Sequence, residues 1–384
     1  MPVINRIADF SDEIAAWRHD FHQHPELLFD VHRTAGIVAD KLRAFGCDAV
    51  ETGIGRTGVV GVIRGRSNAG GRVIDLGADM DALPIMEATD VPYKSKTPGR
   101  MHACGHDGHT AMLLGAAQYL AEMRNFDGTA VMIFQPAEEG GGGDAMVKDG
   151  LMERFGVQEV FGMHNMPGLA VGRFALRPGP MMAAADRFTI TVEGRGGHAA
   201  RPHDCIDPVL AGSQIVNALQ SVVARSVDPL EAAVVSVTVF KAGDTCNVIT
   251  QTATLGGTVR SLSPTVRDLC ETRVKAVAET VASAFGAMAR VDYSRGYPVT
   301  RNAPEQTAFM VEVAGAGAVD DDIPPLMGAE DFSYMLERRP GAYILLGNGD
   351  TAGVHHPAYD FNDAAIPYGA SLWARIVETG MPAR

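Results

Sequence analysis

Positive charge is scarce in this sequence. Its 33 lysine and arginine residues are outweighed by 46 aspartate and glutamate residues, and the formal net charge is −13. Nucleic acids and anionic membranes both attract basic patches, so the charge balance argues against either as a partner. A small anionic substrate is still allowed, because a local site can differ in sign from the whole chain.

Long apolar runs and a disulfide framework are also missing. No apolar stretch approaches the roughly 18 residues of a membrane helix, and the segment Met1–Ser11 contains no apolar signal core. The cysteine count is odd, and the cysteines are scattered along a long chain, which is not the pattern of a disulfide-stapled protein. We therefore expect a protein of the reducing cytoplasm.

The length of 384 residues and the apolar fraction of 46% suggest two domains with sizeable cores. Helical patterns at 9–24, 33–45 and 109–123 alternate with strand patterns at 53–66, 72–78 and 129–134. This alternation predicts an α/β core with covered sheet faces, in which a site forms at the carboxyl ends of the strands.

The pattern changes after residue 180. Strand patterns at 186–193, 232–240, 250–260 and 289–293 are interrupted by helical patterns at 208–227 and 264–285. The order strand–helix–strand–strand–helix–strand is that of a ferredoxin-like domain. We therefore expect a core of residues 1–182 and 297–384 with an inserted lid of residues 183–296. Because an open four-stranded sheet has edges that must be covered, we also expect a symmetric homodimer formed by two lids.

The segment 101–109 is dense in metal-ligand side chains. It contains Cys104 and three imidazoles, His102, His106 and His109. A turn at Gly105 can aim the thiol of Cys104 and the imidazole of His106 at one metal ion. Thiolate and imidazole are the ligands that zinc and the neighbouring transition metals prefer. The alternative is a buried thiol beside a solvent-facing imidazole. His102 and His109 are expected to support the site.

Carboxylates follow two predicted strands. Glu138 and Glu139 come after the apolar strand 129–134, and a buried pair of this kind repels unless a cation is present. One glutamate can bind an ion while the other serves as a general base. Asp79 and Asp81 lie on one side of an extended chain and can orient a ligand or the base. Exposed acidic turns remain the alternative for both pairs.

Further candidates are isolated in the sequence. His164 and His355 lie in separate strand-like contexts, and His356 competes with His355 for any role. In the lid, His198 follows a glycine turn, and Arg260 can hold a carboxylate through two hydrogen bonds. Asn247 flanks a strand. Each of these also has an ordinary interpretation as a loop or surface residue.

Taken in order, these segments resemble a known family. The chain is similar to the metal-dependent aminoacylases and carboxypeptidases, and in particular to the branch of hippurate hydrolases, N-acyl-amino-acid deacylases and indole-3-acetyl-amino-acid hydrolases. The matching segments span nearly the whole chain and are 18–27 (RHDFHQHPEL), 78–84 (ADMDALP), 101–109 (MHACGHDGH), 135–140 (QPAEEG), 196–203 (GGHAARPH), 257–260 (GTVR) and 328–332 (GAEDF).

The resemblance implies an exopeptidase-like α/β catalytic core with an inserted ferredoxin-like lid and dimerisation domain. It also implies two divalent ions, which could be zinc, manganese, cobalt or nickel. Glu138 matches the general base, Asp81 a supporting carboxylate, and His198 a lid histidine that reaches the neighbouring subunit's site. Asn247 and Arg260 match substrate-binding positions, although Cys246 stands where the family often has a large residue. The positions that match metal ligands are Cys104, His106, Glu139, His164 and His355.

The implied reaction is hydrolysis of the amide bond of an N-acyl amino acid. A water activated by the ions loses a proton to Glu138 and attacks the carbonyl, while the metals and His198 stabilise the oxyanion. A dipeptidase or carboxypeptidase of the same family is one alternative. A nucleophilic Cys104 with a histidine base is another, as is a metal or ligand carrier without catalysis.

Overall fold

The computed structural model describes residues 1–383, and the described chain forms two compact units. Unit 1 contains residues 1–181, 301–324 and the segment from Asp331 onward, and unit 2 contains Met182–Thr300 and Pro325–Glu330. The sequence analysis placed 325–330 in the core. This segment groups with unit 2 because the backbone N–H of Ala183 donates to the carbonyls of Leu326 and Gly328.

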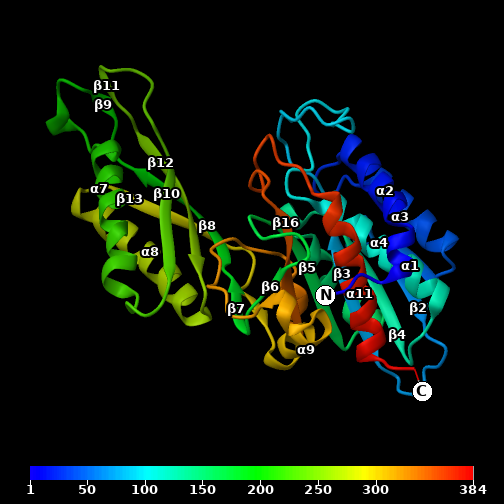
Figure 1. Ribbon diagram of the computed structural model, residues 1–384. Coiled ribbons are helices and arrows are strands. Elements are labelled where there is room, and N and C mark those ends of the chain that lie inside the picture. Colours follow the sequence, from blue (N-terminus) through cyan, green and yellow to red (C-terminus); the bar gives the residue numbers. More distant parts are fainter. Residues whose placement is uncertain (384) are drawn as a thin grey trace. The chain divides into compact units, whose positions relative to one another are not determined.

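Unit 1 is built on an eight-stranded mixed sheet with the strand order β1-β2-β4-β3-β5-β16-β6-β15 (Figure 1). Its four central strands, β4, β3, β5 and β16, are mutually parallel. Strand β4 is buried along its whole length, as expected for a parallel strand covered on both faces. The bounds are β1 Ala49–Ile54, β2 Gly58–Arg64, β3 Val73–Asp79, β4 Thr129–Gln135, β5 Glu159–Pro167, β6 Phe174–Ala175, β15 Val319–Asp320 and β16 Gly341–Gly349.

Helices cover this sheet. Helices α4 and α11 pack against β3, and α2 packs against α4. On the opposite face of β3, the ring of Phe332 lies against Gly77, where a larger residue would collide with it. The bounds are α1 Asn5–Asp9, α2 Ser11–Gln23, α3 His32–Ala44, α4 His106–Met123, α5 Gly142–Lys148, α6 Leu151–Arg154, α9 Pro304–Ala314, α10 Ser333–Leu336 and α11 Ile366–Gly380.

The α/β prediction for the core is confirmed, with two local differences. The expected strand at 53–66 is two antiparallel strands, β1 and β2, because Gly55 and Arg56 turn the chain with φ angles of 57° and 85°. The helix expected at 109 begins at His106. Among the described residues, no helix has the length and apolar character needed to cross a membrane.

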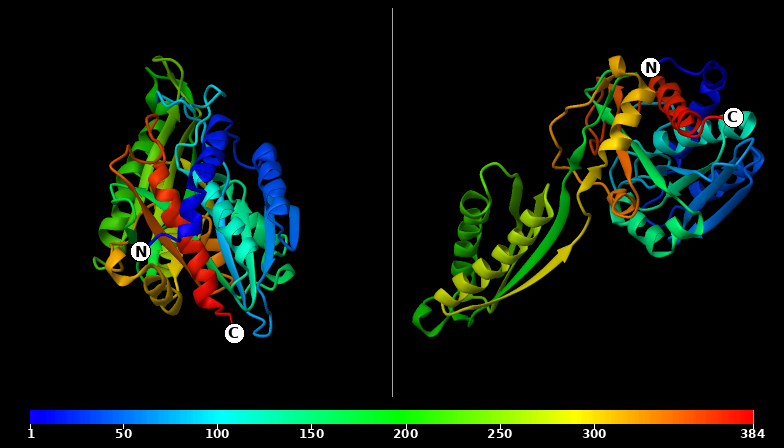
Figure 2. Two further views of the ribbon diagram at one scale, coloured as in Figure 1. Left: turned by 45° about the vertical axis from the view of Figure 1, so that its right-hand side comes forward. Right: turned by 90° about the horizontal axis from the view of Figure 1, so that it is seen from below.

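Unit 2 has a four-stranded antiparallel sheet with the order β10-β12-β8-β13, and α7 and α8 pack side by side on one face of it (Figure 2). Its chain order and strand order are those of a ferredoxin-like domain. The buried core includes Phe188, Ile190 and Leu255. The bounds are β8 Ala184–Glu193, α7 Pro208–Ser221, β10 Ala233–Ala242, β12 Thr252–Ser261, α8 Pro264–Ala284 and β13 Met288–Arg295, with separate pairs β9 Gly197–His198 with β11 Val248–Ile249 and β7 Gly179–Met182 with β14 Thr300–Asn302.

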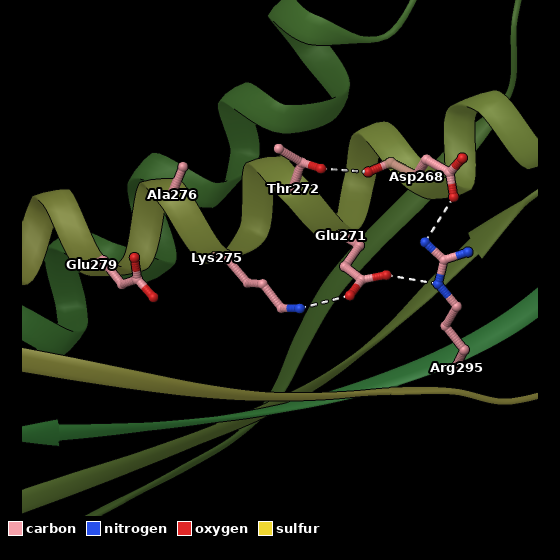
Figure 3. A pocket seen from close by; sticks show the side chains of 7 residues that line it. All are labelled: Asp268, Glu271, Thr272, Lys275, Ala276, Glu279 and Arg295. Atoms are coloured by element: carbon pink, nitrogen blue, oxygen red, sulfur yellow. Dashed lines mark hydrogen bonds and ion pairs between the residues drawn. The ribbon is translucent and has the colours of Figure 1, made fainter.

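Two ion-pair systems hold α8 to the sheet of unit 2, and they differ in burial. Asp186 is 1% exposed, and its carboxylate accepts two hydrogen bonds of 3.1 Å from Nε of Arg267. On the solvent side, Arg295 of β13 pairs with Asp268 and Glu271 of α8 (Figure 3). The buried pair is the costlier one to break, because an unpaired charge would remain inside the protein.

Candidate metal centre

The thiol and the first imidazole are presented by a tight turn before α4. Gly105 lies between Cys104 and His106 with a φ angle of 96°, which glycine adopts without strain. A Cβ atom at this position would lie 2.3 Å from Nδ2 of Asn165 and 2.5 Å from the hydroxyl of Tyr359. The turn therefore requires glycine, and it places both candidate ligand side chains in the interior at the carboxyl end of the sheet.

Five side chains from four parts of unit 1 meet around the sulfur of Cys104. Sγ of Cys104 lies with ring nitrogens of His106 and His164 in one group whose candidate ligand atoms are all within 4.8 Å of one another. The same sulfur lies with Glu139 and His355 in a second group of the same size. Cys104 therefore belongs to both groups and would be a ligand common to them.

The imidazoles of the first group are oriented by backbone carbonyls. Nδ1 of His106 donates to the carbonyl of Asp81 over 2.8 Å, and Nδ1 of His164 donates to the carbonyl of Asn165 over 2.7 Å. This leaves Nε2 of each ring as the candidate ligand atom, and metal-binding histidines are commonly oriented by a hydrogen bond from the other ring nitrogen to a carbonyl. Nε2 of His106 is buried and has no hydrogen-bond partner within residues 1–383. Oδ2 of Asp79 lies 3.4 Å from it, and a buried nitrogen without a hydrogen bond fits a metal ion.

The paired glutamates lie on a short 3-10 turn, Glu138–Gly140, directly after β4. Oδ1 of Asp81 accepts a 2.8 Å hydrogen bond from the backbone N–H of Glu138, and Oδ2 accepts one of 3.3 Å from that of Glu139. Oε1 of Glu139 lies 3.2 Å from Nε2 of His355. Asp81 therefore orients the turn that carries both glutamates, while Glu138 belongs to neither group around the sulfur.

His355 does not lie in a strand, which corrects the strand-like context expected for it. It follows β16 in a turn with a φ angle of 66°, and its backbone N–H donates to the carbonyl of Ala103 over 2.6 Å. This contact fixes the turn beside Cys104, although the side chain of His355 is 51% exposed. His356 is exposed, and its Nδ1 accepts from the N–H of Ala358. His355, and not His356, is the member of the ligand group.

The other two histidines of the segment 101–109 have different surroundings. His109 uses both ring nitrogens inside the protein: Nδ1 donates to Asp79 over 2.7 Å, and Nε2 accepts from the N–H of Asn165 over 3.0 Å. His102 is buried, which lowers its pKa to about 3, so this ring is neutral. Neither histidine is in a group around the sulfur, and His109 acts as an orienting residue.

Burial and charge oppose each other at the thiol. Burial disfavours the thiolate of Cys104, but the imidazoles of His164 and His106 outweigh burial and hold the pKa of this thiol well below its usual value. Burial likewise disfavours a charged His164, but Cys104 and Asp79 raise its pKa to about 9. Without an ion, these pKa shifts favour a thiolate at Cys104 beside an imidazolium at His164. A divalent cation can replace those protons, because thiolate, imidazole and carboxylate are its preferred ligands.

Asn165 and Tyr359 are site residues that the sequence analysis did not identify. Nδ2 of Asn165 donates to the carbonyl of Cys104 over 2.5 Å, and the hydroxyl of Tyr359 donates to Oδ1 of Asn165 over 2.7 Å. Together they hold the backbone of the thiol turn. Asn165 follows His164 directly, so its position was a usable signal, whereas nothing in the sequence connects Tyr359 to the turn.

The three lid candidates lie in unit 2, so they are not members of the cluster in unit 1. His198 is exposed on β9, and Nδ1 of its ring accepts from the N–H of Ala200. Asn247 is close to it in the fold, since its carbonyl accepts from the N–H of Ala199. Arg260 lies on β12 and donates through Nη1 to the carbonyl of Val259 and the hydroxyl of Thr258.

Comparisons with known proteins are in line with this geometry. The family model described as Peptidase family M20/M25/M40 matches residues 76–379. A hippurate hydrolase of Campylobacter jejuni is 44% identical over 382 residues, which cover 98% of each chain. An N-acetyl-L-cysteine deacetylase of Bacillus subtilis is 39% identical, over 94% of this chain and 86% of its own. The crystal structure of a dinuclear metal-binding M20 peptidase from Bacillus subtilis matches with a TM-score of 0.83 and 35% identity, over 97% of this chain and 99% of its own.

Proposed function

This chain belongs to peptidase family M20/M25/M40, and we propose that it is a metal-dependent amidohydrolase that splits N-acyl amino acids. The products are a carboxylic acid and a free amino acid. The hippurate hydrolase and deacetylase relatives, which are named for substrates of this kind, support the proposal. Two divalent ions are the cofactors, in line with the dinuclear relative and with the two ligand groups.

The observation that carries the proposal is that two groups of candidate ligands share the sulfur of Cys104, while Glu138 belongs to neither group. Cys104, His106 and His164 would hold one ion, and Cys104, Glu139 and His355 the other. Glu138 is adjacent in sequence to a ligand, is 6% exposed, and stands outside both groups. A protein that only stores metal does not need a second glutamate beside the candidate ligand Glu139, whereas a hydrolase needs one as a base.

The residues of the chain then have the following roles. When bound, the ions polarise a carbonyl group and make a water molecule more acidic. The carboxylate of Glu138 accepts the proton of the attacking water and delivers it to the leaving nitrogen. Asp81 keeps Glu138 in place through its hydrogen bond to the backbone of that residue. In the lid, Arg260 and Asn247 bind the substrate's carboxylate, and His198 donates to the oxyanion.

A substrate panel tests the activity. The protein is stripped with EDTA, reloaded separately with Zn²⁺, Mn²⁺, Co²⁺ or Ni²⁺, and assayed for release of free amine from N-benzoylglycine, N-acetyl amino acids and dipeptides. We expect no release after EDTA and recovery with at least one ion. Hydrolysis that persists at full rate without metal would instead favour Cys104 as a nucleophile. Metal binding without amine release from any substrate would favour a carrier.

Substitution of the base tests its role. Glu138→Gln keeps the shape of the side chain but cannot accept the proton, so we expect a fall in kcat of roughly 100-fold or more with two ions still bound. The control is Glu153→Gln, which changes an exposed glutamate of α6 that pairs with Arg339. A Glu138→Gln enzyme with near wild-type kcat would refute the role of Glu138 as the base.

We further propose a homodimer formed through unit 2. Strand β10 is an edge of the four-stranded sheet, and Val239 and Phe240 on it are 40% and 42% exposed. Pairing β10 with its copy would cover this edge. Sedimentation showing only monomer at micromolar concentration would contradict it. If His198 acts on the partner's site, mixed His198→Ala and Glu138→Ala chains will regain activity as hybrid dimers.

We propose that the protein acts in a reducing compartment, the cytoplasm. All five cysteines, including the candidate ligand Cys104, are free thiols. A thiolate ligand needs to stay reduced, because oxidation removes its capacity to bind a metal ion. Fractionation of cells that make the protein, followed by immunodetection, would locate it.

A further inference from the structure

A buried arginine contacts two segments that carry candidate metal ligands, the start of α4 and the segment 355–363. Arg18 of α2 is 0% exposed, and its Nε donates to Oδ2 of Asp107 over 2.8 Å. Asp107 is the residue after His106, a ligand of the first group. Through its other two nitrogens, Arg18 binds Asp360 and Asp363, the second of these at 3.3 Å. These two aspartates lie in the segment 355–363, which begins at His355.

The surroundings of Arg18 fix it in place. Its guanidinium carbon lies 4.6 Å from the ring centre of Tyr93, whose hydroxyl donates to Oδ2 of Asp360 over 2.8 Å. The ring of His19 stacks on Tyr93 and places Nε2 within 2.7 Å of Asp363. A planar guanidinium that is buried among three carboxylates and an aromatic face has one orientation available to it, which makes it a rigid connector.

We call the two groups around the sulfur half-sites: Cys104 with His106 and His164, and Cys104 with Glu139 and His355. The positions of their side chains depend to different degrees on Arg18. Cys104 and His106 are buried, and His164 lies on the central strand β5. His355, by contrast, is half exposed, lies in a turn after β16 and has a left-handed backbone conformation, which is unfavourable for a residue with a side chain. Its position therefore depends on its backbone hydrogen bond to Ala103 and on what anchors the rest of the segment 355–363.

We propose that Arg18 is a positioning residue that sets the affinity of the half-site containing His355. It does so by tying Asp360 and Asp363 to Asp107, and thus the loop of His355 to the first turn of α4. This inference rests on the proposed two-ion function. Outer-sphere partners of metal ligands change metal affinity by roughly 10–100-fold when they are removed, and we expect an effect of that size on one of the two ions.

The test uses Arg18→Met and, because that change leaves three carboxylates without their partner, a second, double variant, Asp360→Ala with Asp363→Ala, which removes both contacts of Arg18 with the segment 355–363. The double variant keeps Arg18 and Asp107 paired. Each folded protein is stripped with a chelator and titrated with Mn²⁺ by calorimetry, and the bound metal is counted after dialysis. The expected result is an unchanged Kd for the tighter ion and a Kd raised about 10-fold or more for the weaker one.

The matched control is Arg33→Met, because Arg33 pairs with Asp20 of the same helix α2 at the exposed surface. It should leave both Kd values unchanged. A folded double variant with both affinities as in the wild type would overturn the proposal, and so would equal weakening of both ions. Failure of the proposed function is separate and visible in the wild type, as two bound ions without amine release from the substrate panel.

Discussion

Gly105→Ala is the sharpest test of the geometry around the thiol turn. The added Cβ costs energy twice: it strains a backbone with a φ angle of 96°, and it meets Asn165 and Tyr359 at 2.3 and 2.5 Å. Left-handed backbone costs a non-glycine residue about 1–2 kcal/mol, and overpacking typically costs about 1–3 kcal/mol more. The expected loss of stability is therefore about 2–5 kcal/mol.

Gly46→Ala separates the energy cost of left-handed backbone from the energy cost of overpacking. Gly46 has a similar φ angle of 83°, but a Cβ atom there would have no neighbour within 4 Å. The control should lose only the backbone term of about 1–2 kcal/mol. Because 1 kcal/mol shifts the Tm of a domain of 150–250 residues by about 2–4 °C, thermal unfolding monitored by circular dichroism can resolve the difference.

Metal binding should weaken where the added Cβ collides with its neighbours, and should not change where the substitution only strains the backbone. In Gly105→Ala, Asn165 must move and its hydrogen bond to the carbonyl of Cys104 is disturbed, so we expect weaker metal binding as well as a lower Tm. Gly46→Ala should bind metal as the wild type does. Equal Tm values for the two variants, or wild-type metal affinity in Gly105→Ala, would show that the close contacts at Gly105 do not hold the turn.

Three further predictions concern charges. Burial alone would lower the pKa of His22, but Asp107 and Glu87 outweigh burial and raise it to about 9 from a reference value of 6.5. By linkage, His22 contributes about 3 kcal/mol to stability, and this contribution is complete below pH 6.5 and is lost as the pH rises through 9. His22→Gln should therefore flatten the fall in the free energy of urea unfolding over that pH window. Asp81→Asn places an amide group where two backbone N–H groups donate, and we expect kcat to drop roughly 10–100-fold with both ions retained; an unchanged kcat would show that Asp81 does not position the base. Arg267→Met leaves a buried carboxylate unpaired and should destabilise unit 2 by about 3–5 kcal/mol, whereas the exposed Arg295→Met should cost under about 1 kcal/mol, as calorimetry of the two variants would show.

Much of the site could be predicted because its residues follow strands. Asp79, Asp81, Glu138 and Glu139 come at or just after the ends of β3 and β4, and parallel neighbours bring such ends to one edge of a sheet. Short-range patterns therefore identified residues that meet in space. The assignment of His355 was weaker, because its place depends on a turn after β16 and on a hydrogen bond to Ala103, neither of which leaves a periodic pattern.

The orienting network could not be predicted, for a physical reason. Arg18 pairs with Asp363, which is 345 positions further along the chain, and with Asp107, which is 89 positions away. Any of the many acidic residues could have been its partner on charge alone. Which carboxylates are buried beside a guanidinium follows from how α2, α4 and the segment 355–363 pack, and that information is absent from local sequence.

The charge of the metal centre has a consequence for substrate binding. Asp79, Asp81, Glu138 and Glu139 together with the thiolate of Cys104 carry up to five negative charges, and two divalent ions would offset four of them. The acidic side chains of unit 1 do not attract a free carboxylate on the substrate. Arg260 of unit 2 has the opposite character: within the described chain its Nη1 donates only to Thr258 and Val259, both uncharged. A guanidinium without a hydrogen-bonded carboxylate among residues 1–383 is available for one from the substrate, which supports the proposal that Arg260 recognises the substrate's carboxylate.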